Sequence, residues 1–226
     1  MFPSTDIVHH FHPIAWVAQM KLLEKQTGKC FCNRDFTVDD VKKIVKTITT
    51  KEEIWTGITE NCPIKDKSFE TLTDELNRMF KKYNINDCIQ KIAFLAQVSA
   101  ETGLFRQTIE EKSRYLSSQS TYKGRGIIQL TGDKDDTGYY NKSGVYKKYA
   151  NYINDQSIIS SPNKIAEDVH YAIDSAGWYF SKYKKIPTWF IFIIENQVIN
   201  YETVKITVKF NAFIRSISRF EILLQI

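Results

Sequence analysis

Three glutamates near the middle of the chain have the spacing and surroundings that acid–base chemistry requires. Glu101 directly follows the apolar run FLAQVSA, and Glu110 and Glu111 come nine and ten positions later in the polar segment TIEEKSR. An apolar helix end favours the protonated form of a carboxyl group, whereas a polar segment keeps a carboxylate ionised. Such a pair can cleave a glycosidic bond: one group protonates the leaving oxygen, and the other activates water or attacks the sugar. Each glutamate alone could equally be an ordinary exposed side chain, so the prediction depends on the neighbouring elements.

A glycine-flanked arginine follows the glutamates in a segment of β-type sequence. Residues 124–132 read GRGIIQLTG, in which Arg125 lies between two glycines and the run 126–131 favours a strand. The glycines permit tight backbone turns next to the arginine. We therefore expect a small antiparallel sheet or hairpin within residues 113–132, followed by a polar loop over 133–144.

The elements that must position these residues are predicted to be mainly helical. Helices are expected in four segments, 37–50, 67–83, 163–182 and 202–220. Thr37 is a typical N-cap residue for the first of them. A further helix begins near Asp87 and carries Glu101 at its end, because Gly103 is the residue type usually found just past a helix C-terminus. The fold class is therefore mainly α (α+β), a helical domain with a small antiparallel β wing.

Length and composition set limits on organisation and partners. The 226 residues suit one compact unit over 67–226 with an N-terminal appendage over 1–66, packed on it or leading into it. A net charge of +5 suits a polyanionic partner such as a bacterial cell wall and is too small to indicate nucleic acid. The richest apolar run, 189–194, is far shorter than a membrane span, so no span is expected.

Neither the cysteines nor the other candidate ligands predict a metal site. The spacing of Cys30 and Cys32 is too short for a usual zinc knuckle, and both disulfides and free thiols remain open for the four cysteines, Cys30, Cys32, Cys62 and Cys88. The three histidines near the N-terminus, His9, His10 and His12, are interpreted as exposed or at the edge of the core. The loop from Asp133 starts like a calcium loop but has Gly144 at its twelfth position, so a solvated loop is favoured.

The segments AQVSAETGLF and YKGRGIIQLTG, with Glu110 between them, together resemble the pattern of glycoside hydrolase family 19. That family includes plant chitinases and many bacterial and phage endolysins of lysozyme-like fold. Its members have an apolar helix end, A-Q-x-x-H-E-[ST]-G-G-[FL], then a second glutamate, then Y-x-G-R-G-x-I-Q-L-[ST]. The resemblance covers roughly residues 69–220 and implies a lysozyme-like catalytic domain within 67–226 that needs no cofactor and no metal.

The resemblance implies a role for each matching residue. Glu101 falls on the general acid and Glu110 on the general base. Glu111 is the alternative base, because its distance to Tyr115 matches the family register E-N-x-x-Y. Thr131 falls on the hydroxyl residue that helps to hold the attacking water. Positions that line the sugar-binding region, brace the carboxylates or lie at the substrate edge correspond to Tyr122, Arg125, Gln129 and Asn211.

Several positions depart from the family pattern. Ala100 replaces the histidine before the acid, Leu104 replaces the second glycine after it, and Ala212 and Phe213 replace the glycines after the late asparagine. These departures affect the fit to the substrate more than the acid–base pair. The resemblance thus implies an inverting muramidase acting on the glycan strands of peptidoglycan. Chitin is the alternative substrate, and a non-catalytic wall-binding domain is the alternative class.

The N-terminal sequence bears on where such a protein would act. It lacks the pattern of a secretory signal, and an enzyme of the periplasm or cell wall would then be delivered by a secretion system or released on lysis. The segment FHPIAWVAQM is similar to linker regions before toxin domains in type VI secretion effectors. That similarity favours an antibacterial effector over a phage endolysin, and an effector implies a cognate immunity protein as a partner.

Overall fold

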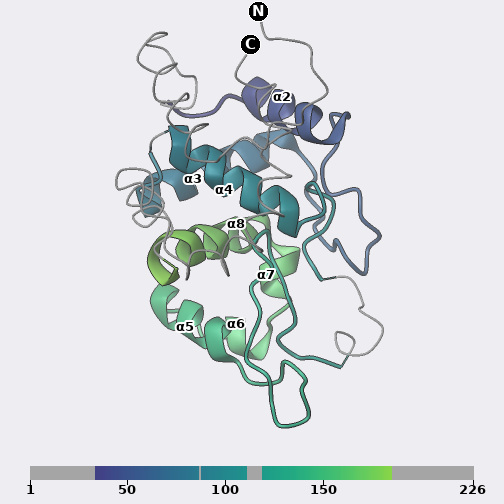
Figure 1. Cartoon of the computed structure of the whole chain (residues 1–226), viewed down its shortest axis with the longest axis vertical. Coiled ribbons are helices and arrows are strands. Elements are labelled where there is room, and N and C mark those ends of the chain that lie inside the picture. Colours follow the sequence, from purple (N-terminus) through teal and green to yellow (C-terminus); the bar gives the residue numbers. More distant parts are fainter. Residues whose placement is uncertain (1–33, 87, 111–118, 185–226) are drawn as a thin grey trace, which may run out of the picture.

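The computed structural model describes residues 34–86, 88–110 and 119–184 (Figure 1). The expected helix over 202–220 and the apolar run 189–194 lie outside this part of the chain. Within it, the structure is mainly helical, as predicted. No helix among the described residues combines the length and apolarity that crossing a bilayer requires.

The first described helices match their sequence signals closely. Helix α2 spans Val38–Thr49, and Thr37 caps it in a reciprocal capping box with Asp40. Helix α3 spans Phe69–Tyr83, and the Ser68 side chain accepts a hydrogen bond from the backbone N–H of the third helical residue. Both helices end at a residue with left-handed backbone conformation, which satisfies the terminal carbonyl groups.

Helix α4 spans Cys88–Glu101 and therefore ends at the candidate acid, as predicted. Gly103 follows with a φ of +58°, in the left-handed region that favours glycine. Helix α4 lies beside α3 in Figure 1. Three of its described hydrophobic side chains, Phe94, Leu95 and Val98, are buried and join the core.

The helix predicted over 163–182 is divided into three pieces. Helix α7 spans Lys164–Glu167, α8 spans Val169–Trp178, and a π-helical turn, η2, spans Tyr179–Tyr183. Asp168 separates α7 from α8 because its backbone is extended, with φ −107° and ψ 122°, and its side chain accepts from the His170 N–H. Asp168 thus ends one helix and caps the next, a use of aspartate that apolar periodicity does not reveal.

Two helices lie where the sequence analysis assigned none. Helix α5 spans Gly144–Ile153 and α6 spans Ser157–Ser160. The inner face of α5 consists of Tyr146, Tyr149 and Ala150, all fully buried. Tyrosine is a modest helix former, so this helix owes its stability to packing rather than to propensity.

The predicted β wing is not formed in the described residues. Residues 126–129 form a turn, and the region has only isolated antiparallel bridges, Ile109 with Arg125, Arg125 with Leu130, and Asp133 with Lys142. Ile127 and Ile128 are both buried, and the Ile127 N–H donates to a carbonyl of α8. The apolar run that indicated a strand is therefore a turn packed against a helix, with Gly126 at φ +73° and Gln129 at φ +53°.

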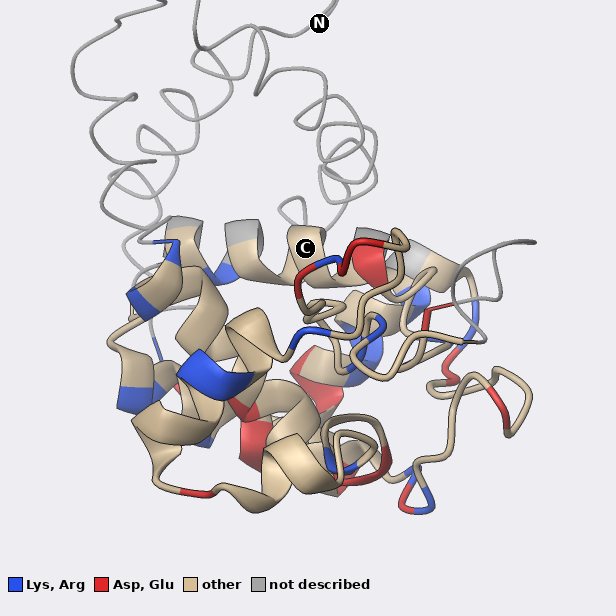
Figure 2. Ribbon diagram, turned by 90° about the horizontal axis from the view of Figure 1, so that it is seen from below, with Lys and Arg blue, Asp and Glu red and all other residues tan. Residues whose placement is uncertain are grey.

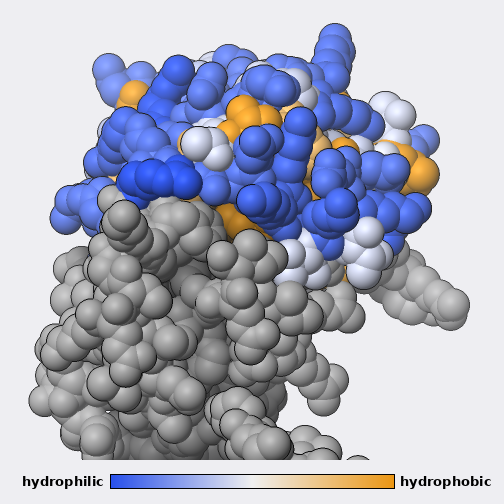
Figure 3. All heavy atoms as spheres, turned by 90° about the horizontal axis from the view of Figure 1, so that it is seen from above, coloured by the Kyte–Doolittle hydropathy of each residue, from blue (hydrophilic) through white to orange (hydrophobic). Residues whose placement is uncertain are grey.

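The core is centred on the contact between α3 and α8, with α2 packed on α3 and α7 on α8. Gly177 of α8 allows the close approach, because a Cβ atom there would overlap Met79 and Tyr83 of α3. The described surface is mostly polar, and Figure 3 shows one face on which hydrophobic residues form only small patches. Among the described residues, the large hydrophobic side chains that are exposed are Ile58 and Tyr152.

A buried carboxylate joins three elements of this core. Asp174 of α8 accepts hydrogen bonds from the Tyr83 hydroxyl of α3, at 2.9 Å, and the Tyr149 hydroxyl of α5, at 2.9 Å. It also forms an ion pair with Lys82 at 2.6 Å. Burial and the adjacent carboxylate raise the pKa of both tyrosines, so each remains a neutral hydrogen-bond donor.

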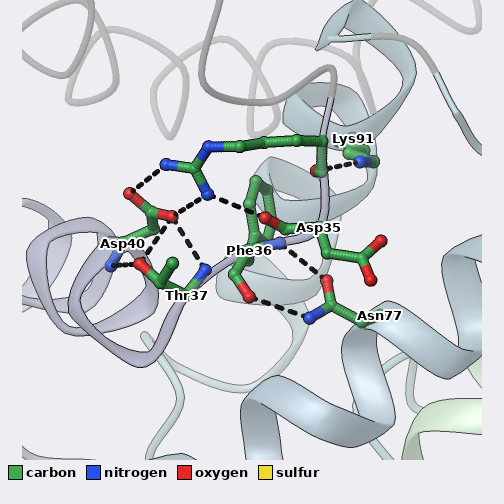
Figure 4. Close-up of polar contacts among 7 residues, drawn as sticks. Asp35, Phe36, Thr37, Asp40, Asn77 and Lys91 are labelled. Carbon is green, nitrogen blue, oxygen red and sulfur yellow. Dashed lines mark hydrogen bonds and ion pairs between the residues drawn. The ribbon is translucent and has the colours of Figure 1, made fainter.

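The described part of the predicted N-terminal appendage shares this core. Side chains from before, within and after α2 belong to the same cluster, Phe36, Val41, Ile54, Trp55 and Ile64. Figure 4 shows how the segment before α2 is fixed: Asn77 bonds both backbone groups of Phe36, and Lys91 donates to the Arg34 carbonyl at 2.9 Å. The boundary at residue 66 stays a prediction.

Candidate functional site

Glu101 lies at the C-terminal end of α4 and is partly buried. The Gln97 side chain, one turn earlier, donates from Nε2 to Glu101 Oε1 at 2.6 Å. The charge of Glu101 also affects η2: burial, the neighbouring Tyr183 and, least, Glu101 raise the pKa of Tyr179.

The chain leaves Glu101 through a strained reversal. Gly103, Leu104 and Phe105 have φ values of +58°, +68° and +59°, and the Leu104 N–H closes the turn on the Ser99 carbonyl at 2.7 Å. Leu104 occupies the position where the family pattern has a second glycine, and its backbone has the conformation that favours glycine. A left-handed conformation costs a residue with a Cβ atom about 1–2 kcal/mol, so the reversal persists at a cost in stability.

Glu110 is held by the glycine that precedes Arg125. The Glu110 N–H donates to the Gly124 carbonyl at 3.0 Å, and the Gly124 N–H donates to Glu110 Oε2 at 3.2 Å. A Cβ atom on Gly124 would lie 2.8 Å from Gln129 Oε1 and 3.2 Å from Glu110 Oε2. Glycine is therefore required here for the close approach of two side chains, whereas the sequence analysis invoked it only for tight turns.

Arg125 is buried and braces the loop that carries this glycine. Its Nη1 donates to the carbonyls of Thr121, at 2.9 Å, and Lys123, at 3.2 Å, and its Nε donates to Asn163 Oδ1 at 2.9 Å. Nη1 also lies 3.2 Å from the Tyr146 hydroxyl. The guanidinium forms no ion pair with a described carboxylate, so it acts on Glu110 through the position of the loop.

Tyr146 completes this brace from the unpredicted helix α5. Its hydroxyl donates to the Lys123 carbonyl at 2.5 Å. Burial raises the pKa of Tyr146 to about 12; Arg125 opposes the rise and the charge of Glu110 adds to it. Tyr146 therefore stays protonated across the working range of an enzyme and is close enough to sense the charge of Glu110.

The remaining residues of the motif make internal contacts. Gln129 donates from Nε2 to the Gly126 carbonyl at 3.2 Å, and its buried Oε1 accepts no hydrogen bond from the described residues. The Thr131 hydroxyl donates to the Gln129 carbonyl at 2.8 Å. The Tyr122 hydroxyl donates to the Ile159 carbonyl at 3.1 Å. Gln129 thus brings an unused acceptor next to Gly124 and Glu110.

The structure brings together part of the set that the sequence suggested. One cluster consists of Glu110, Gly124, Arg125 and Gln129. Glu101 is not part of this cluster and precedes the reversal at 103–105 in the chain. Glu111 and Asn211 lie outside the described residues. Sequence reasoning missed Tyr146 and Asn163, which contact Arg125, and Tyr179, whose pKa is affected by the charge of Glu101. No signal marked the first, because its helix was not predicted.

No metal centre is present among the described residues, where no group of three or more His, Cys, Asp or Glu side chains could hold an ion. The loop from Asp133 is organised instead by Asp135, which accepts from the Thr137 hydroxyl at 2.6 Å and from Asn141 at 2.8 Å. Cys62 is a free, buried thiol, and burial raises its pKa.

Comparisons with known proteins find likeness among solved structures and not among sequences. No protein-family model and no curated protein matches the chain. The crystal structure of a family GH19, class IV chitinase from Zea mays is similar, with 14% sequence identity, a TM-score of 0.35, and coverage of 93% of this chain and 94% of that one. At this TM-score the likeness is a finding on which no functional assignment rests.

Proposed function

We propose that this protein is a glycoside hydrolase that cleaves the β-1,4 bonds of bacterial peptidoglycan by an inverting acid–base mechanism. One observation carries the proposal. The segment ending at Glu110 and the segment around Arg125 pair with each other, so that the Gly124 N–H holds one carboxylate. The residues of the family-like motif therefore contact one another in the structure. The helix that precedes them in the chain ends at a second carboxylate, Glu101.

Glu101 is the proposed general acid. Its Oε1 accepts the Gln97 amide at 2.6 Å, so in the protonated group the proton resides on Oε2. As a general acid, Glu101 carries this proton before the reaction. As the glycosidic bond breaks, the proton passes to the leaving oxygen and Glu101 becomes a carboxylate.

Glu110 is the proposed general base. The Gly124 N–H donates to its Oε2, and in the proposed mechanism Oε1 takes a proton from the attacking water. The Thr131 hydroxyl donates its own proton to the Gln129 carbonyl. In the proposed mechanism its oxygen therefore accepts a hydrogen bond from that water. In an inverting enzyme the two carboxyl groups are about 6.5–9.5 Å apart, which leaves room for the water.

Peptidoglycan is the proposed substrate because the net charge of +5 favours an anionic polymer. Chitin has the same β-1,4 linkage and the same N-acetyl groups but no charge. An enzyme of this kind acts in the periplasm or cell wall. We assign it to delivery as an antibacterial effector, with a cognate immunity protein that blocks the site, or to release as an endolysin.

Clearing of purified peptidoglycan tests the proposal. Wild-type protein should reduce the turbidity, and Glu101→Gln should lower the rate about 10²- to 10⁴-fold, the usual contribution of a general acid. Glu53→Gln removes the charge of an exposed glutamate elsewhere and is the matched control. Equal clearing by Glu101→Gln and wild type would refute the role of Glu101, and wall binding without clearing would establish the non-catalytic class.

Analysis of the released fragments identifies the bond. Mass spectrometry should find N-acetylmuramic acid at the new reducing ends, and NMR of fresh product should show the α-anomer, because one displacement inverts the anomeric carbon. A β-anomer would contradict inversion. Release of fragments from colloidal chitin, without any from peptidoglycan, would replace the proposed substrate.

A further inference from the structure

A row of aromatic rings follows one side of the molecule where α3, α5, α8 and η2 meet. Trp178 lies at its centre. Its ring is stacked on that of Tyr183, with the centroids 5.3 Å apart, and its centroid is 6.2 Å from that of Tyr152. Tyr179 continues the row beyond Tyr183 at 5.4 Å, and Tyr83 continues it beyond Tyr152 at 6.3 Å. We call these five residues the aromatic row.

The row is open to solvent on its outer side. Tyr152 is 47% exposed, although large hydrophobic side chains are otherwise almost all buried in the described part of the chain. Tyr179 and Tyr183 are partly exposed, whereas Trp178 and Tyr83 are buried. A buried tryptophan thus supports a surface of tyrosine rings.

Three exposed lysines place cations on these rings. Lys148 lies 5.1 Å and Lys184 5.3 Å from the centroid of the Tyr183 ring. Lys82 lies 5.2 Å from the centroid of the Tyr83 ring. Figure 2 shows several Lys and Arg segments on the left of the ribbon, the side on which α5 and the end of α8 lie in Figure 1.

Two of the described carboxylates bear on the charge of the row, and one of them balances Lys82. Asp174 is buried and is paired with Lys82 and two tyrosine hydroxyls. Glu101 is the proposed acid, and its charge affects the pKa of Tyr179 after burial and Tyr183. The excess positive charge of the row therefore comes from Lys148 and Lys184, at Tyr183.

The combination selects one chemistry. Flat aromatic faces pack against the C–H faces of pyranose rings, and ammonium groups that are exposed to solvent pair with carboxylates. A neutral glycan would use only the rings, and an acidic peptide would use only the lysines. A peptidoglycan strand offers both, because its sugars carry peptide stems with free carboxylates.

We propose that Tyr152, Tyr179 and Tyr183 of the aromatic row, together with Lys148 and Lys184, form a binding surface for a peptidoglycan strand, with sugars on the tyrosine rings and stem carboxylates on the lysines. The surface holds the polymer beyond the bond that is cut and rests on the proposed function for the identity of that polymer. Binding is nevertheless a separate property from cleavage, and it can be measured when cleavage is absent.

Co-sedimentation with teichoic-acid-free sacculi tests the surface, with the full chain carrying Glu101→Gln so that the wall is not consumed. Adding Lys148→Glu and Lys184→Glu should weaken binding about tenfold or more at low salt, since two attractions become repulsions. Lys43→Glu with Lys51→Glu makes the same change of charge on and just after α2, where neither side chain makes a described contact, and should leave binding nearly unchanged.

Tyr152→Ala tests the aromatic contacts and should weaken binding to sacculi about threefold or more. Ile58→Ala removes the other exposed large hydrophobic side chain of the described residues and should not weaken binding.

Three outcomes would overturn the proposal. Equal losses in the surface and control variants would mean a general effect of net charge. Unchanged binding in both surface variants would mean that the strand binds elsewhere. Chitin bound as tightly as sacculi, and lost in the lysine variant, would refute the carboxylate contacts. Clearing by the Glu101→Gln chain would refute the proposed acid and not the surface, which is tested by the difference in binding between the surface and control variants.

Discussion

Two carboxylates of this protein, Asp174 and Glu110, differ in how many hydrogen-bond and ion-pair partners they have. Asp174 is buried in the core and receives two tyrosine hydroxyls and a lysine ammonium. Glu110 is partly exposed, and the described contact to its carboxylate is the Gly124 N–H. A carboxylate whose lone pairs are filled by rigid donors contributes to stability. One that is held at a single oxygen is oriented and still able to accept a proton.

The backbone shows the same contrast. Seven non-glycine residues in the described part have positive φ, and three of them, Thr50, Asn84 and Asn154, end helices in the usual way. The other four, Trp55, Leu104, Phe105 and Gln129, surround the candidate site, and the Trp55 N–H donates to the Phe105 carbonyl at 2.7 Å. Strain therefore collects next to the two glutamates and not in the α3–α8 core, as is common at functional sites.

The largest expected effect comes from removing the satisfied carboxylate. Asp174→Ala leaves two buried tyrosine hydroxyls and a lysine without their partner, so it should cost about 3–5 kcal/mol of unfolding free energy. Urea denaturation measures it. Asp136→Ala removes a fully exposed aspartate and should have almost no effect. A loss below about 1 kcal/mol in Asp174→Ala would refute the structural role of this cluster.

The next effect concerns the held carboxylate. Gly124→Ala places a methyl group against Glu110 and Gln129, so it should misplace the base and lower the rate of wall clearing about 10- to 100-fold. The melting temperature should fall much less than in Asp174→Ala. An unchanged rate would show that the Gly124 contact does not position the base.

A smaller effect tests the strain at the reversal. Gly103 has φ +58° and no atom within 4 Å of its missing Cβ, so Gly103→Ala should cost only the backbone term, about 1–2 kcal/mol. Gly138, at φ +86° and equally open, lies in the distant polar loop and is the matched control. Similar losses of stability are expected in both, with a loss of activity confined to Gly103→Ala. Equal activities of the two variants would show that the reversal does not affect catalysis.

The smallest effect is a pH dependence in the polar loop. Hydrogen bonds from the Thr137 side chain, and then from Asn141 and the loop backbone, lower the pKa of Asp135 from 3.8 to about 2. The folded state therefore favours the ionised form, and this contribution is present above about pH 4 and lost as pH falls toward 2. Thermal unfolding of Asp135→Asn should show a weaker dependence on pH between 4 and 2 than wild type. An identical dependence would contradict the low pKa.

Sequence reasoning succeeded where one local pattern determined one element. The capping signals at Thr37 and the apolar stripe of 67–83 placed α2 and α3, and the small residue after the acid placed the end of α4. It failed where tertiary packing overrode local preference. The run 126–131 has strand propensity but is a turn because α8 covers it, and α5 is a helix because its tyrosines are buried. The cluster at Glu110 depends on both the turn at 126–129 and helix α5. Spacing in the sequence could therefore suggest its residues but not their contacts.

The central claim is that Glu110, held by Gly124, is the base. The most direct test compares the rates at which Glu110→Gln and Glu111→Gln release reducing ends from peptidoglycan, with folding checked by circular dichroism. We expect Glu110→Gln to lose about 10²- to 10⁴-fold in rate and Glu111→Gln to remain within a few-fold of wild type. A large loss in Glu111→Gln with activity retained in Glu110→Gln would contradict this account and assign the base to the neighbouring residue.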